Sequence, residues 1–349
     1  MLQGKGGRRY GLLASAGFVA VAAVLMLQVV AVCAGSVSPA VRQAYFNAID
    51  DASNATQRKV ATDLLAIVPG NDHVNKTRLG GCDIVWEGKP GNSRVLVAAF
   101  MSRESYVNYY KTNLEEHQPE YILKKSLWVT VVPELQNFFV RKKSGGSSRE
   151  ATGGCAPTVD RMVRLLGLNP GMSYEILLEL WVDPKVLFRP SADPEATDHE
   201  GQVTRKNSNG EYVFPADVTP FVAFDDTELY METSKSICPT CTQWTYKNWF
   251  VNRIGYIYNK GNVNDPTSWG YPWTRLGYTY DWGNRKNHVG ASEFVIRLDP
   301  AKQDATVTVT LHRAIDSAKR EWKKYFRCRP GCTDEGNWSA VESGDPLEN

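Results

Sequence analysis

The first 34 residues constrain the compartment in which the rest of the chain folds. They contain three basic residues (Lys5, Arg8 and Arg9) and no acidic residue, and the run 11–35 is almost entirely apolar or small. A basic stretch followed by an apolar one is typical of a secretory signal, because the apolar helix enters the bilayer while the bases stay in the cytoplasm. We therefore expect residues 1–34 to be a signal peptide or N-terminal membrane anchor, and the remainder to be exported, either periplasmic or secreted.

The sequence leaves open whether this segment is removed. Val32-Cys33-Ala34 places small residues where a signal peptidase cuts, which favours cleavage before Gly35. The apolar run nevertheless reaches the ~20 residues that span a bilayer, so an uncleaved anchor is the alternative. Cys33 also suggests a lipoprotein with a lipid on this cysteine. However, Val32 lies just before Cys33, where a lipoprotein signal has a small residue. No second hydrophobic run approaches a membrane span, so we expect membrane contact only through residues 11–34, if they are retained.

The cysteine count favours disulfides in the exported part. Apart from Cys33, the chain contains Cys82, Cys155, Cys238, Cys241, Cys328 and Cys332. An even number of cysteines in an oxidising compartment is typical of disulfide bonds. The close spacing suggests local links within 238–241 and within 328–332, which leaves Cys82 for Cys155. Other pairings are equally permitted, because sequence does not determine connectivity.

Size and charge set broad limits on the exported part. About 315 residues follow the N-terminal segment, enough for one large domain or two modest ones. Loss of the three bases changes the formal net charge from +2 to −1. A nearly neutral protein has no overall electrostatic attraction to nucleic acid, so we expect no nucleic-acid partner.

Hydrophobic periodicity predicts a mixture of helices and strands. Residues 159–166 place apolar side chains at helical spacing, whereas 305–311 alternate as a half-buried strand does. The mixture has no regular βαβ rhythm and includes a hairpin, which favours an α+β fold with a mixed, largely antiparallel sheet and flanking helices. The expected helices are 38–67, 134–140, 159–166, 242–258 and 315–326, and the expected strands are 83–87, 94–100, 127–132, 176–182, 221–224, 228–231, 293–298 and 305–311.

A Gly- and Ser-rich stretch at 141–154 is the best internal boundary, because it has no apolar periodicity. It is expected to be a flexible loop or linker between a helical segment with a β-hairpin region at 35–140 and a main α+β region at 155–332. The polar residues 333–349 are expected to form a loose tail.

The sharpest short motif is Cys238-Pro239-Thr240-Cys241 at the start of an expected helix. A helix N-terminus stabilises a thiolate, so such a pair can catalyse thiol–disulfide exchange. These four residues and the helix after them resemble the active site of thioredoxins, but residues 230–237 lack the buried parallel strand of that family. The alternative is a structural disulfide that holds the start of the helix in place. A zinc site with Cys328 and Cys332 is formally possible, yet we expect no metal or other cofactor.

Residues 269–284 form an aromatic segment interleaved with Gly, Thr and polar side chains. Aromatic faces stack on sugars or flat ligands while carboxylates and amides fix their orientation, so this segment is the candidate ligand-binding surface. The alternative is that the rings attach a long loop to the core. The candidate residues are Trp269, Tyr271, Trp273, Arg275, Tyr278, Tyr280, Asp281 and Trp282.

Two acidic clusters are weaker candidates. One stretch carries four carboxylates and a histidine that could bind a hard cation, although its spacing matches no calcium or zinc motif. Asp225-Asp226 follows an expected strand end, where catalytic carboxylates often lie; both clusters are also ordinary surface chemistry. The candidate metal ligands are Asp193, Glu195, Asp198, His199 and Glu200.

The sequence thus predicts an exported protein that binds an envelope or extracellular ligand, such as a glycan or envelope polymer, through the aromatic segment. One alternative is a thiol–disulfide oxidoreductase that uses Cys238 and Cys241. The other is a non-enzymatic structural or interaction protein of the cell envelope. The chain contains no nucleophile elbow, phosphate-binding Gly loop or dinucleotide fingerprint, so whether it is an enzyme stays open.

Overall fold

A computed structural model describes residues 37–144, 156–214, 246–298 and 306–326. The described residues from Ser38 onward belong to one compact unit. Its centre is a seven-stranded sheet in the order β2-β11-β4-β1-β3-β10-β5, in which every neighbouring pair is antiparallel. The strands are β1 (Val95–Met101), β2 (Glu120–Leu123), β3 (Leu127–Val131), β4 (Ile176–Val182), β5 (Leu187–Phe188), β10 (Phe294–Ile296) and β11 (Val307–Asp316). The expected α+β class with an antiparallel sheet is confirmed.

Short helices and two small two-stranded sheets surround this centre. The helices are α1 (Pro39–Ser53), α2 (His73–Arg78), α3 (Arg103–Tyr109), α4 (Lys111–Glu115), α5 (Glu134–Ser144), α6 (Val159–Leu165), α8 (Tyr246–Ile257) and α9 (Arg320–Tyr325), with 3₁₀ turns η1 (Gln57–Lys59), η2 (Pro184–Val186) and η3 (Pro266–Ser268). The small sheets pair β6 (Arg205–Lys206) with β7 (Tyr212–Val213), and β8 (Tyr278–Tyr280) with β9 (Val289–Ser292). None of the helices in these ranges is long and apolar enough to cross a membrane.

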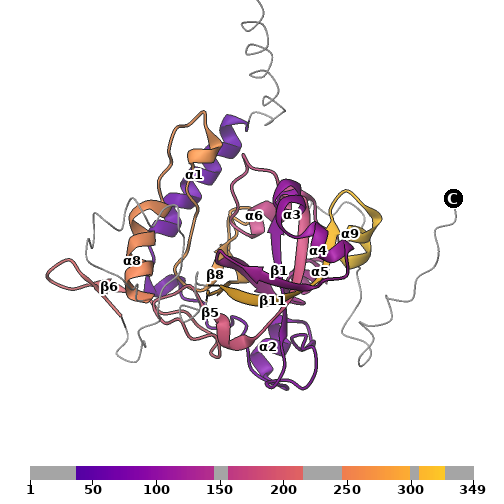
Figure 1. Cartoon of the computed structure of the whole chain (residues 1–349). Coiled ribbons are helices and arrows are strands. Elements are labelled where there is room, and N and C mark those ends of the chain that lie inside the picture. The colour runs from indigo at the N-terminus through magenta and orange to yellow at the C-terminus, as the bar shows by residue number, and fades with distance from the viewer. Residues whose placement is uncertain (1–36, 145–155, 215–245, 299–305, 327–349) are drawn as a thin grey trace, which may run out of the picture. The chain divides into compact units, whose positions relative to one another are not determined.

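The sheet separates two layers of apolar packing. β1 and β4 are buried along nearly their whole length, as expected for central strands covered on both faces. Leu79, just after α2, joins the cluster on one face, and Met162 of α6 joins the cluster on the other. Figure 1 shows α2 and α6 on opposite sides of the sheet. Strands from 35–140 and from 155–332 are intermixed in this sheet, so both ranges build one core.

The expected helix 38–67 is too long. Its start is confirmed, since the Ser38 hydroxyl accepts a bond from the Val41 amide and Pro39 occupies the first helical position. The helix ends at Ser53, and residues 60–67 form neither a helix nor a strand. Leu64 and Ile67 donate their amides to the 196–199 backbone. Residues 64–67 are all buried. An amphipathic surface helix would bury only the residues on one of its faces, so burial of four consecutive residues does not fit the predicted helix.

Two other elements differ from expectation. The predicted hairpin of 83–87 with 94–100 shrinks to one bridge between Trp86 and Val95, because the Val85 amide donates to the Val132 carbonyl instead. The predicted strand 305–311 and helix 315–326 also shift. β11 continues past a bulge to Asp316, where its pairing with β4 outweighs the helical spacing of Ile315.

Several expectations lie outside the described residues. They are the N-terminal segment 1–34, the linker residues 145–154, the strands 221–224 and 228–231, Asp225-Asp226, and the tail 333–349. Cys82 is buried, and its Sγ lies 3.9 Å from Asn137 Oδ1. The six other cysteines also fall in ranges that the structure does not describe, so the cysteine pairings and the redox alternative at Cys238 and Cys241 stay predictions.

Candidate functional site

The structure buries most of the aromatic segment. Of the eight predicted ligand-binding residues, only Tyr271 is substantially exposed, at 38%. Burial of the others favours the alternative in which the rings attach a long loop to the core. The seven buried residues are Trp269, Trp273, Arg275, Tyr278, Tyr280, Asp281 and Trp282.

The three tryptophans of this segment pack against aromatic rings of the core. Trp269 and Trp282 both contact Tyr45 of α1, with ring centroids 6.3 and 5.7 Å away. Trp273 packs edge-on against Phe250 of α8, at 4.9 Å. The Arg164 guanidinium covers the Trp282 ring at 4.6 Å. Aromatic contacts of this kind stabilise a core, so these three rings do not offer free faces to a sugar.

The two charged residues of the segment also bond to other parts of the protein. The Asp281 carboxylate receives both terminal nitrogens of Arg161, at 2.8 and 2.6 Å. Arg275, in a left-handed backbone conformation with φ of 60°, donates to the Ser53 carbonyl at 2.6 Å and thereby ties the segment to the end of α1. Neither group is available to orient a ligand.

Of the eight candidate residues, Tyr278 and Tyr280 line a pocket, together with Thr274 and Leu276 of the same segment. The pocket has a volume of about 270 Å³ and is lined by three stretches of chain that are distant in sequence. These stretches are the end of α1 with η1 (51–60), the segment residues 274–280, and the turn residues 286–289. We call this cavity the Tyr280 pocket.

A network of hydrogen bonds fixes one wall of the Tyr280 pocket. The Tyr280 hydroxyl donates to Asp51 Oδ2 at 2.9 Å, and Lys59 Nζ lies 2.9 Å from Asp51 Oδ1. Burial opposes ionisation of Asp51, but the bonds from Lys59 and Tyr280 outweigh it and lower the pKa of the carboxyl. The pKa of Tyr280 is raised by burial and by its bond to Asp51. Near neutral pH the wall therefore carries a carboxylate and a neutral phenol.

His288 forms the facing part of this wall. Its ring stacks on Tyr280, with centroids 4.5 Å apart and planes within 15°. His288 Nδ1 lies 3.2 Å from the Asp281 carbonyl oxygen. A carbonyl only accepts hydrogen bonds, so Nδ1 carries the proton, and Nε2 has no hydrogen-bond partner in the described ranges.

Two cations in the pocket wall have no counter-ion among the described residues. Arg58 of η1 and Lys286 of the turn make no ion pair with any residue that the structure describes. Among the lining residues that the structure describes, Asp51 is the single carboxylate, and Lys59 already neutralises it. The Tyr280 pocket therefore carries an excess of positive charge.

The acidic stretch predicted as a weak metal site does not gather around one point. Asp193 accepts bonds from the Glu195 amide and from Gln202. His199 donates from Nδ1 to the Leu64 carbonyl, and its Nε2 lies 3.2 Å from Asp72. Within the described ranges no three His, Cys, Asp or Glu side chains are placed to hold a metal ion.

Asp198 instead lies beside a buried arginine. Its Oδ1 is 3.6 Å from Nε of Arg189, which is fully buried and donates to the backbone carbonyls of Leu65 and Asp198. Burial raises the pKa of the Asp198 carboxyl to about 6, despite the attraction of Arg189. Glu200 is exposed, and Glu195 contacts Thr197. The stretch thus holds a loop onto the core.

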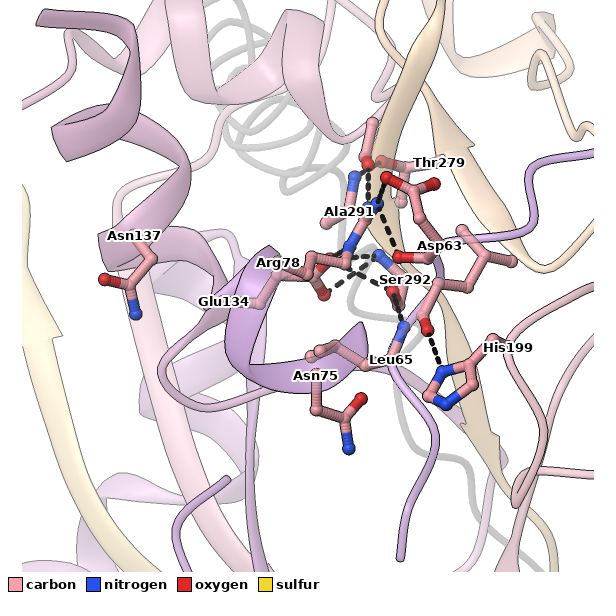
Figure 2. A network of polar contacts seen from close by, with 12 residues as sticks. Asp63, Leu65, Asn75, Arg78, Glu134, Asn137, His199, Thr279, Ala291 and Ser292 are labelled. Carbon is pink, nitrogen blue, oxygen red and sulfur yellow. Dashed lines mark hydrogen bonds and ion pairs between the residues drawn. The ribbon is translucent and has the colours of Figure 1, made fainter. Parts of the chain in front are cut away.

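A second buried network joins α2, α5 and β9 (Figure 2). The Glu134 carboxylate accepts bonds from Arg78 Nε at 2.5 Å and from the Ser292 amide at 2.9 Å. The Ser292 hydroxyl donates to Glu134 at 3.0 Å and accepts from the Leu65 amide at 2.8 Å. Because protein groups fill these positions, the network is a structural connection. Nothing local in the sequence marks it, since its members are up to 227 residues apart.

Comparisons with protein-family models, with curated proteins and with solved structures find no match to this chain. Arguments about function therefore rest on its own residues.

Proposed function

We propose that the protein is exported and binds a small polar ligand of the glycan class in the Tyr280 pocket. The observation that carries the proposal is the pocket itself, in which the aromatic segment meets η1 and the turn 286–289. Export is supported by the basic and apolar pattern of residues 1–34. In the exported part, disulfides within the expected cysteine set would stabilise the fold.

The lining chemistry supports a hydroxyl-rich ligand. Asp51 has lone pairs beyond those used by Lys59 and Tyr280, and carboxylates commonly accept bonds from sugar hydroxyls. Asn287 uses its side-chain oxygen to accept from the Val289 amide, which leaves its NH₂ group as a donor. Apolar surface from Val60, Leu276 and Val289 lies beside these groups. Mixed apolar surface with a few fixed polar groups is typical of small-molecule sites.

The size of the pocket supports a ligand of about one sugar residue. Its volume of about 270 Å³ lies just below the range of roughly 300–1,000 Å³ that holds drug-sized molecules. The His288 ring covers one face of Tyr280, so recognition would depend on hydrogen bonds more than on stacking.

The test is a binding screen with the exported protein, using an array of neutral and acidic oligosaccharides. Binding should be lost in Val289→Trp, which fills the pocket from β9. Val213→Trp is the matched control, because Val213 is 51% exposed on β7. Thermal denaturation of both variants checks that they fold. Absence of binding to every oligosaccharide, or equal binding by folded Val289→Trp, would refute the proposal.

A further inference from the structure

The unpaired cations of the Tyr280 pocket narrow the chemical class of its ligand. We infer that the pocket binds a sugar residue that bears a carboxylate, that is, a uronic acid, with Arg58 and Lys286 holding the acid group. This inference rests on the proposed function, because it assigns the substrate class of the same pocket.

The charges in the pocket are the first part of the argument. Lys59 and Asp51 form an ion pair at 2.9 Å and cancel each other. Arg58 and Lys286 remain, and no described carboxylate lies within ion-pair distance of either. A neutral sugar would leave both cations without a counter-ion, whereas a carboxylate would neutralise at least one of them.

The position of these cations is the second part. Arg58 belongs to η1, next to Lys59, and Lys286 belongs to the turn that joins β8 to β9. The two basic groups therefore enter the lining from separate stretches of chain. The Tyr278 hydroxyl bonds the Lys59 carbonyl at 2.7 Å and so fixes η1 against β8. This bond holds the backbone that carries Arg58 in place before a ligand arrives.

The remaining groups suit the sugar ring. Asp51 is held in its charged form at the Tyr280 side of the pocket and accepts hydroxyl donors. The Asn287 NH₂ group and the free Nε2 of His288 lie in the same lining stretch as Lys286. A free inorganic anion would use the cations but would gain nothing from Asp51, which would repel it. The combination of two cations with one fixed carboxylate therefore favours an acidic sugar over phosphate or sulfate.

The experiment compares three probes by isothermal titration with the exported protein. D-Glucuronate and D-glucose share a ring and differ at the carboxylate. Inorganic phosphate tests whether the site binds any anion, with no sugar ring required. We expect glucuronate to bind at least tenfold more tightly than either of the others, because charge-assisted hydrogen bonds are stronger than neutral ones. Its affinity should fall as NaCl rises, because Arg58 and Lys286 are both exposed to solvent.

Charge variants locate the acid group. Arg58→Gln and Lys286→Gln should each weaken glucuronate binding roughly five- to tenfold and should weaken glucose binding by a smaller factor. The matched controls Arg205→Gln on β6 and Lys324→Gln on α9 remove exposed cations far from the lining residues and should change neither.

The outcomes separate this inference from the proposed function. Glucose binding as tight as glucuronate, with no effect of Lys286→Gln or Arg58→Gln, would overturn the acidic-sugar inference and leave the glycan pocket standing. Phosphate binding as tight as glucuronate would also overturn it, in favour of a simple anion site. Lack of binding to any sugar, here and on the array, would overturn both.

Discussion

Arg161 of α6 holds the buried carboxylate of Asp281 with both of its terminal nitrogens, at 2.8 and 2.6 Å. The same carboxylate accepts the Gly283 amide at 3.1 Å. Asp281 is fully buried, and the Arg161 side chain is only 15% exposed. This pair therefore fixes the end of the aromatic segment to the helix that packs on the central sheet.

Asp281→Asn should strongly destabilise the protein, because it leaves the Arg161 charge buried without its partner. Breaking a buried ion pair on one side typically lowers the free energy of unfolding by about 3–5 kcal/mol. The control is Asp160→Asn, since Asp160 is 61% exposed and pairs with Arg164 on the same helix. That change should cost less than about 1 kcal/mol. Urea denaturation measures both, and equal losses would contradict the assigned role of the Asp281 pair.

Trp273→Ala should likewise lower the free energy of unfolding. Trp273 is 5% exposed and contacts Trp128, Trp249 and Phe250. Removal of a buried tryptophan typically costs about 3–5 kcal/mol, whereas Tyr271→Ala, at a site that is 38% exposed, should cost less than about 1 kcal/mol. A Trp273→Ala protein of unchanged melting temperature but lost glycan binding would show that this ring faces a ligand after all.

The Asp281 and Trp273 contacts show that composition alone does not decide whether an aromatic segment binds a ligand or packs on the core. A run of tryptophans and tyrosines is equally suitable for a ligand groove and for the underside of a long loop. The distinction depends on Tyr45 and Phe250, which lie far away in sequence and supply the opposing faces. Tyr278 and Tyr280 line a pocket, and their predicted role in ligand binding stays a prediction.

The rest of the pocket could not be predicted, because it forms by convergence of distant segments. Asp51 and Tyr280 are 229 residues apart, and neither carries a local motif. Secondary structure could be predicted where the sequence has one clear periodicity, as in the alternation of 305–311. The prediction was wrong at Ile315, where pairing with Leu177 of β4 extends the strand through residues whose spacing also suits a helix.

The N-terminal segment makes a separate prediction about processing. The intact mass of the exported protein should correspond to a chain that begins at Gly35, because Val32-Cys33-Ala34 precedes it. If disulfides hold the exported part together, alkylation before reduction should add no mass, and alkylation after strong reduction should label six thiols. A full-length chain that sediments with membranes would instead establish the uncleaved anchor. Ready labelling of two thiols mapped to Cys238 and Cys241 would favour the redox alternative.

Glu293 predicts how stability depends on pH. It lies between β9 and β10, and its Oε2 atom is buried with no hydrogen-bond partner in the described ranges. Burial raises the pKa of this carboxyl from 4.5 to about 8, and the nearby Arg253 offsets only part of that rise. Between these values the folded protein keeps a proton that the unfolded chain has released. The free energy of unfolding should therefore fall as pH rises from about 4.5 to about 8, and this contribution should level off above pH 8.

Glu293→Gln should remove that dependence, because a neutral amide has nothing to ionise. The variant and the parent should have similar stability near pH 4.5, and at pH 8 the variant should be more stable by on the order of 1–3 kcal/mol. Asp198, with a pKa raised to about 6, adds a fall of the same sign at lower pH. The diagnostic window is therefore pH 6 to 8, where only the Glu293 slope should disappear. Urea denaturation at several pH values measures it, and equal slopes in both proteins across that window would show that the Glu293 carboxyl is already ionised in the folded state.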